Sequence, residues 1–168
     1  ARPLSGRGGI SGQLDSSRRP NCQTSNAVFG GLAYSAPNVF VPCENRGLVA
    51  LKVDLTNHTF SEAWVTATSF NPRAPIVAGG VVWTVSAGGR LYGFDPASGA
   101  LRFDIAAGGT TPFATPTEDN GWVFVPESTR VQGFSFNWES IGGHLSSAPD
   151  AASRGARRQD AFGRGGGV

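Results

Sequence analysis

The chain has 168 residues, of which 15% are charged and 24 are glycine, and its formal net charge is +2 at pH 7. A chain of this length can bury a core, and its low charge and many glycines favour an all-β protein over a helical one. No apolar run approaches the ~20 residues of a membrane-spanning helix, so we expect no membrane span.

The two ends of the chain differ in composition from its middle. Residues 1–20 and 141–168 are rich in glycine, serine and arginine and show no apolar periodicity, which is typical of disordered segments. We therefore expect a disordered N-terminal segment, a folded part over residues 21–140 and a disordered C-terminal tail. An arginine-rich tail could bind RNA weakly, but a solvated end is the simpler interpretation, and no nucleic-acid partner is expected.

Cys22 and Cys43 flank the first pair of predicted strands, within residues 26–41. If these strands return on each other, the two cysteines come close, and a disulfide across such a loop stabilises a fold by about 3 kcal/mol in the loop-entropy model. Two buried free thiols, or a reactive or metal-binding cysteine, are the alternatives. The sequence has only two histidines, His58 and His144, and no base close to either cysteine, which favours the structural disulfide.

Residues 74–105 contain the clearest structural unit of the sequence. Four short runs of β-branched and aromatic residues are separated by turns at Gly79-Gly80, at residues 87–89 and at residues 95–99. Glycine pairs adopt the positive φ that tight turns need, and an aspartate that opens a turn accepts hydrogen bonds from the amides after it. The unit therefore predicts one four-stranded antiparallel sheet.

The central hairpin of this unit recurs in the sequence, with copies that begin at Asn38, Val81 and Trp122. Two sets of positions match across the copies, the valine that ends the first strand (Val41, Val85, Val125) and the small residue of the return strand (Ala50, Gly93, Gly133). The period of about 40 residues is that of four-stranded propeller blades.

This repeat predicts an all-β fold of about three antiparallel four-stranded blades of a β-propeller, over residues 24–66, 67–107 and 110–138. Propellers usually hold four to eight blades, so three blades form an incomplete ring. We expect a C-terminal fragment of a longer chain, or an oligomer that completes the ring, and the fragment is the favoured interpretation.

The segment PIVAGGVVWTVSAGGRLYGFDPASGALRF resembles the repeat of pyrroloquinoline-quinone-type propellers, in which glycine turns separate hydrophobic strands. The segments AVFGGLAY, VFVPCENRGLVAL and PFATPTEDNGWVFVP resemble the last repeats of exported bacterial propeller proteins, relatives of the propeller lipoprotein of the outer-membrane barrel assembly machinery. The resemblance covers residues 26–136. It implies an extracellular or periplasmic, cell-envelope location, and it places Cys22 and Cys43 where that subgroup carries a paired cysteine.

In this family an aromatic residue at the end of the outer strand docks one blade on the next. The resemblance assigns that role to Trp64 in the first repeat and to Phe103 in the second, where phenylalanine lacks the indole N–H that bonds the neighbouring blade. In the third repeat no strand of matching length follows Phe136. We therefore expect this repeat to lack its outer strand, which in a closed ring the other end of the chain commonly supplies.

The family also contains quinone-dependent dehydrogenases, which require a calcium-binding carboxylate cluster and an aspartate base. The carboxylates of this sequence do not gather in that way, because Asp54 and Asp95 occupy equivalent turns and residues 118–120 read as a turn cap. His58 and His144 lie in polar or glycine-rich segments with no partner residue at a telling spacing. The tryptophans of the repeats are expected to fill the space between sheets rather than line a ligand funnel (Trp83, Trp122, Trp138).

We therefore expect no catalytic, cofactor-binding or metal-binding residue and no cofactor. The favoured function is a non-catalytic propeller segment that serves as a binding scaffold for protein or peptide partners, or for missing blades of the same chain. The alternative is the C-terminal fragment of a quinone- and calcium-dependent dehydrogenase whose catalytic residues lie on missing blades.

Overall fold

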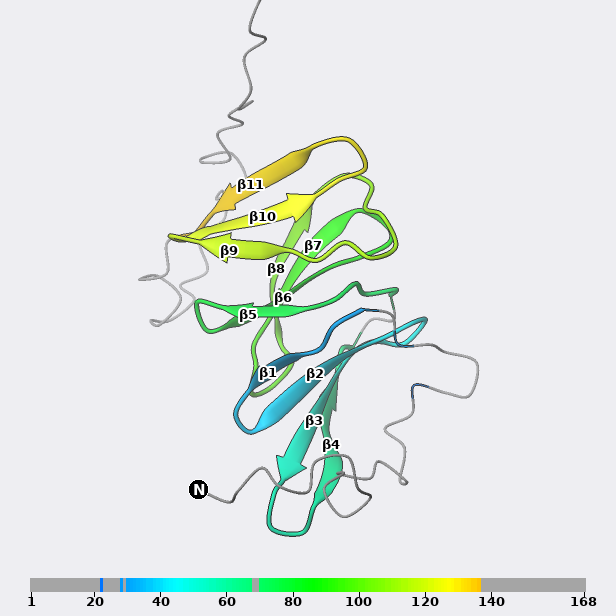
Figure 1. Cartoon of the computed structure of the whole chain (residues 1–168), viewed down its shortest axis with the longest axis vertical. Coiled ribbons are helices and arrows are strands. Elements are labelled where there is room, and N and C mark those ends of the chain that lie inside the picture. The colour runs from blue at the N-terminus through cyan, green and yellow to red at the C-terminus, as the bar shows by residue number, and fades with distance from the viewer. Residues whose placement is uncertain (1–21, 23–27, 29, 68–69, 137–168) are drawn as a thin grey trace, which may run out of the picture.

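The computed structural model describes Cys22, Val28 and residues 30–67 and 70–136. Within these residues the chain forms eleven strands in three antiparallel sheets and no helix (Figure 1). The predicted end segments, 1–20 and 141–168, lie outside the described residues. The all-β architecture of propeller blades is confirmed, and we call the sheets blades 1, 2 and 3 in chain order.

Blade 1 has four strands in the order β1-β2-β3-β4. Its strands are β1 (Ala33–Ser35), β2 (Asn38–Cys43), β3 (Gly47–Asp54) and β4 (Thr59–Val65). The first strand is shorter than the sequence predicts, since only residues 33–35 pair continuously with β2 and Val28 adds one isolated bridge to Cys43.

Blade 2 repeats this arrangement, and blade 3 has three strands within the described residues. The strands of blade 2 are β5 (Ile76–Ala78), β6 (Val81–Val85), β7 (Arg90–Phe94) and β8 (Leu101–Ala106). Those of blade 3 are β9 (Thr117–Asp119), β10 (Trp122–Pro126) and β11 (Val131–Ser135). Each blade therefore starts with a short strand and continues outward through its central hairpin.

The three sheets stack face to face along the chain order, and the first strands of blades 1 and 2 contact each other (Figure 1). We call the face of a blade that is directed toward the next blade its forward face and the opposite face its rear face. One core cluster lies between blades 1 and 2, another between blades 2 and 3, and a third on the rear face of blade 1. The core is thus made of layers between sheets, as in a propeller.

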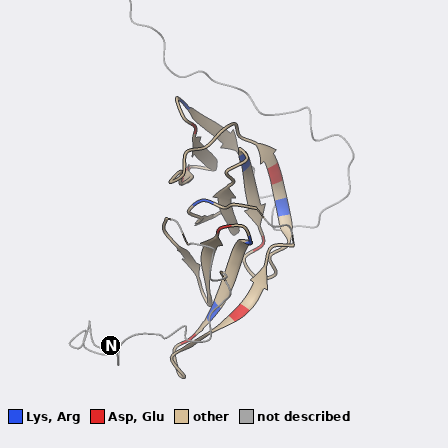
Figure 2. Ribbon diagram, turned by 90° about the vertical axis from the view of Figure 1, so that its right-hand side faces the viewer, with Lys and Arg blue, Asp and Glu red and all other residues tan. Residues whose placement is uncertain are grey.

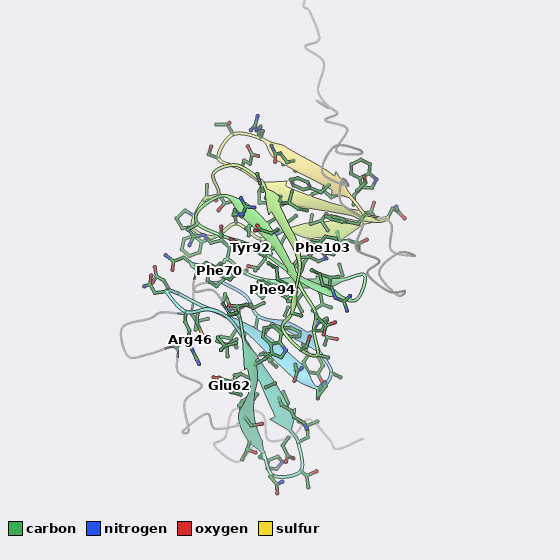
Figure 3. The ribbon with its side chains drawn as sticks, turned by 180° about the vertical axis from the view of Figure 1, so that it is seen from behind. Arg46, Glu62, Phe70, Tyr92, Phe94 and Phe103 are labelled. Carbon is green, nitrogen blue, oxygen red and sulfur yellow. A yellow bond between two sulfur atoms is a disulfide. The ribbon has the colours of Figure 1, made fainter. Side chains whose placement is uncertain are left out.

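The layer between blades 1 and 2 is rich in aromatic rings. Phe40 and Trp64 reach it from blade 1, with ring centroids 5.6 Å apart. Tyr92 and Phe94 meet them from blade 2 and Phe70 from the segment between β4 and β5, and Figure 3 shows these three side chains gathered at the centre of the molecule. Rings in tilted and offset contact of this kind stabilise a layer beyond the area that they bury.

The pairing register matches each forward-facing aromatic residue to a small residue on the next strand. Three such pairs occupy equivalent places in the blades, Phe40 opposite Ala50, Trp83 opposite Gly93 and Phe124 opposite Gly133. A Cβ added at Gly93 would lie 2.9 Å from the Trp83 ring, so the glycine gives the ring its space. This large–small pairing is a repeated property of the blades.

The register also corrects the sequence alignment at one position. Val85 pairs with Leu91, which lies two residues before the small Gly93. Val41 and Val125 instead pair with the residue that directly precedes the small residue of their own blade, Ala50 or Gly133. The residues equivalent to Val85 are therefore prolines (Pro42, Pro126). Side chains alternate along a strand, so a shift of one residue moves a side chain to the other face of the sheet. The prediction that Val41, Val85 and Val125 are equivalent was therefore wrong.

Cys22 and Cys43 form a disulfide with a Cα–Cα distance of 5.3 Å. Cys43 is fully buried at the end of β2, in the rear-face cluster of blade 1, and the half-buried Cys22 packs against that cluster. The bridge therefore ties the chain ahead of β1 to the rear face of the first blade.

Opening this disulfide should destabilise the protein. The bridge spans a sequence separation of 21 residues, and closing a loop of this size stabilises by about 3 kcal/mol in the loop-entropy model. We expect a reductant to lower the melting temperature measured by circular dichroism. A Cys22→Ala/Cys43→Ala variant should have a lower melting temperature than the natural chain without reductant, and adding reductant should not lower it further. A melting temperature of the natural chain that does not change with reductant would contradict the prediction.

A second prediction concerns the contact between Gly99 of blade 2 and the Trp64 ring of blade 1. Gly99 has φ +72° and its added Cβ would lie 2.6 Å from the ring, whereas Gly80 has φ +69° and open space around it. Gly80→Ala should cost about 1–2 kcal/mol through backbone strain alone. Gly99→Ala should lower the free energy of unfolding by about 1–3 kcal/mol more than that, because the added methyl group overpacks the contact with the Trp64 ring.

Urea unfolding measures both losses of stability. In a Trp64→Leu background the ring is gone, so the difference between the two alanine variants should shrink. Equal costs for Gly80→Ala and Gly99→Ala in the natural background would show that the glycine does not make room for the ring.

Candidate binding surfaces

Two side chains of blade 1 bind one carbonyl of blade 2. The indole Nε1–H of Trp64 donates to the Pro96 oxygen at 3.1 Å, and the Asn38 side-chain amide donates to the same oxygen at 3.2 Å. Pro96 lies in the turn between β7 and β8, where its carbonyl faces the preceding blade. Trp64 therefore contacts the next blade through this carbonyl.

Phe103 occupies the equivalent place in blade 2 and makes only ring contacts. Its centroid lies 4.9 Å from that of Trp83 and 5.2 Å from that of Phe136, which directly follows β11. Trp83 belongs to the same blade as Phe103, whereas Phe136 joins it from blade 3. The absence of an N–H on this ring removes the carbonyl contact that Trp64 makes.

A groove of about 320 Å³ lies beside the bonds to Pro96, between blades 1 and 2. It is lined by the β1–β2 turn, by Lys52 and Ala63, and by the Pro96–Ala97 turn. Among the described residues, no group donates to the buried Oδ1 of Asn38. The groove could hold a small molecule, but its lining brings no pair of acidic and basic groups together for proton transfer.

The turn aspartates are held by backbone amides. Asp54 Oδ1 accepts from the amides of Thr56 and Asn57 at 2.8 and 2.9 Å, and these bonds, led by that of Asn57, lower the pKa of the Asp54 carboxyl. Asp54 therefore serves as an acceptor that shapes its turn, as the sequence predicts.

Asp95 opens the equivalent turn in blade 2. Its Oδ1 accepts from the amides of Ala97 and Ser98 at 2.9 and 2.8 Å, and its Oδ2 pairs with Arg102. Burial raises the pKa of the Asp95 carboxyl, but the bonds from Ser98 and Ala97 and the nearby Arg102 charge outweigh it and lower the pKa overall.

The other described ion pairs join neighbouring strands, the two sides of a turn, or a turn and a strand. They are Arg46–Glu62 at 3.0 Å, Arg90–Asp104 and Arg130–Glu127. Hydrogen bonding to Asp104 raises the pKa of Arg90. Figure 2 shows the acidic and basic positions distributed over several strands and turns of the ribbon.

The other candidates for chemistry are the remaining carboxylates and the two histidines. In the described ranges, no three His, Cys, Asp or Glu side chains come together in a way that could hold a metal ion. Glu118 accepts from the Gly121 amide at 3.1 Å and so caps its turn. His58 is exposed in the β3–β4 turn with φ 52°, and His144 lies outside the described residues.

The forward face of blade 3 is the largest departure from what the sequence predicts. Trp83 is fully buried, as expected, but Trp122 is 37% exposed and Val131 is 66% exposed. The equivalent positions in blades 1 and 2 are buried beneath the next blade (Asn38 and Val81 for Trp122, Leu48 and Leu91 for Val131). The register confirms this equivalence. The two exposed residues define an apolar candidate surface together with Phe124, whose ring stacks 6.4 Å from that of Trp122.

No protein-family model and no curated protein matches the chain, but solved structures do. The crystal structure of BamB from Moraxella catarrhalis has a TM-score of 0.51 and 19% identity, covering 67% of this chain and 34% of that one. A europium-containing methanol dehydrogenase gives a TM-score of 0.50 and 15% identity, covering 67% of this chain and 24% of that one. The computationally designed Ika8 protein gives a TM-score of 0.50 and 13% identity, covering 62% of this chain and 32% of that one.

These likenesses confirm the propeller fold of pyrroloquinoline-quinone type that the sequence motifs predict. The chain spans about a third or less of the length of each of these proteins. Among the described residues, no helical segment has the length and apolar character of a membrane span.

The turn aspartates predict how stability depends on pH. The pKa of Asp54 and that of Asp95 lie below the ordinary value of 3.8 in the folded protein. Their contribution is therefore complete above that value and is lost as the pH falls through it toward the folded pKa. We expect the free energy of unfolding in urea to drop from about pH 5 to about pH 3.

Asp95→Asn keeps a side-chain oxygen for the turn but carries no charge and does not titrate, so the variant should be less stable at neutral pH and should show a weaker acid dependence. Gln132→Asn serves as a control, because it changes a neutral side chain on β11 and should preserve the natural dependence. Identical acid profiles for the Asp95→Asn variant and the natural chain would contradict the assignment.

Proposed function

We propose that this chain is a non-catalytic propeller segment of an exported bacterial protein, and that it binds protein partners through the forward face of blade 3. The observation that carries the proposal is the exposure of Trp122 and Val131 at positions which the other two blades cover with a neighbouring sheet. Apolar residues that gather on one face and lie open to solvent mark interaction surfaces.

Several further observations support a scaffold role. Asp54 and Asp95 are engaged by turn amides, Glu62, Asp104 and Glu127 pair with arginines, and the two cysteines are joined. A disulfide suits an oxidising compartment outside the cytoplasm. The likeness to BamB concerns the fold alone. A cell-envelope location and protein partners agree with it.

The alternative is a part of a quinone- and calcium-dependent dehydrogenase, a class to which the likeness to a methanol dehydrogenase draws attention. The two functions differ in what the purified full-length parent protein does when pyrroloquinoline quinone and calcium are supplied, because the alternative places the catalytic residues on blades outside this chain. We expect no quinone binding by fluorescence titration and no reduction of a dye with alcohols or sugars. Quinone-dependent dye reduction would overturn the scaffold proposal.

Site-specific photocrosslinking tests the binding surface directly. A photoreactive amino acid at position 131, on the forward face of blade 3, should form crosslinks to protein in the bacterial cell envelope. The same group at position 55, where Leu55 is 71% exposed in a turn of blade 1, is the matched control and should form few.

Trp122→Ser should reduce the crosslinks from position 131 several-fold, because it removes the largest apolar side chain of the surface. Equal yields from positions 131 and 55, or no effect of Trp122→Ser, would contradict the proposed surface.

A further inference from the structure

We draw no further inference here: the strongest candidate, the groove between blades 1 and 2 that is lined by Lys52 and the Pro96–Ala97 turn, carries nothing, because Asn38 Oδ1, to which no group of the described residues donates, is buried away from solvent and nothing in the structure shows which ligand would fill the groove.

Discussion

The stacking of the three blades depends on one steric constraint, the pairing of a large ring with a small residue on the adjacent strand. Phe40 with Ala50 and Trp83 with Gly93 allow the ring of a fourth strand to lie flat within the layer between sheets. Sheets pack about 10 Å apart, which leaves room for interleaved rings only when their neighbours are small. A larger residue at the small position would force the next blade away or tilt it.

A second contact fixes how the blades are oriented. Packing between apolar rings is not directional, whereas the bonds from Trp64 and Asn38 to the Pro96 oxygen are. Gly99, in the same turn, lets the turn approach the Trp64 ring closely. Ring packing thus supplies most of the attraction between blades 1 and 2, and one shared carbonyl sets their relative position.

Much of this fold could be predicted from sequence because its turns carry strong local signals. The glycine pairs marked the turns, and the copies of the central hairpin that begin at Asn38, Val81 and Trp122 indicated the blade period. The register could not be predicted in the same way, since Val85 and its neighbours are alike in apolarity and only strand pairing decides which face each one takes. The exposure of Trp122 also escaped prediction, because a strand pattern shows that a residue is suited to burial and not whether a sheet covers it.

The disulfide on the rear face of blade 1 gives the stack a direction. At that end the buried cluster around Cys43 is packed by Cys22, which is covalently fixed to it. At the other end Trp122 and Val131 are open to solvent. The two ends of the stack therefore differ, because the Cys22–Cys43 bond holds a residue against the rear face of blade 1 whereas two apolar residues of blade 3 are exposed.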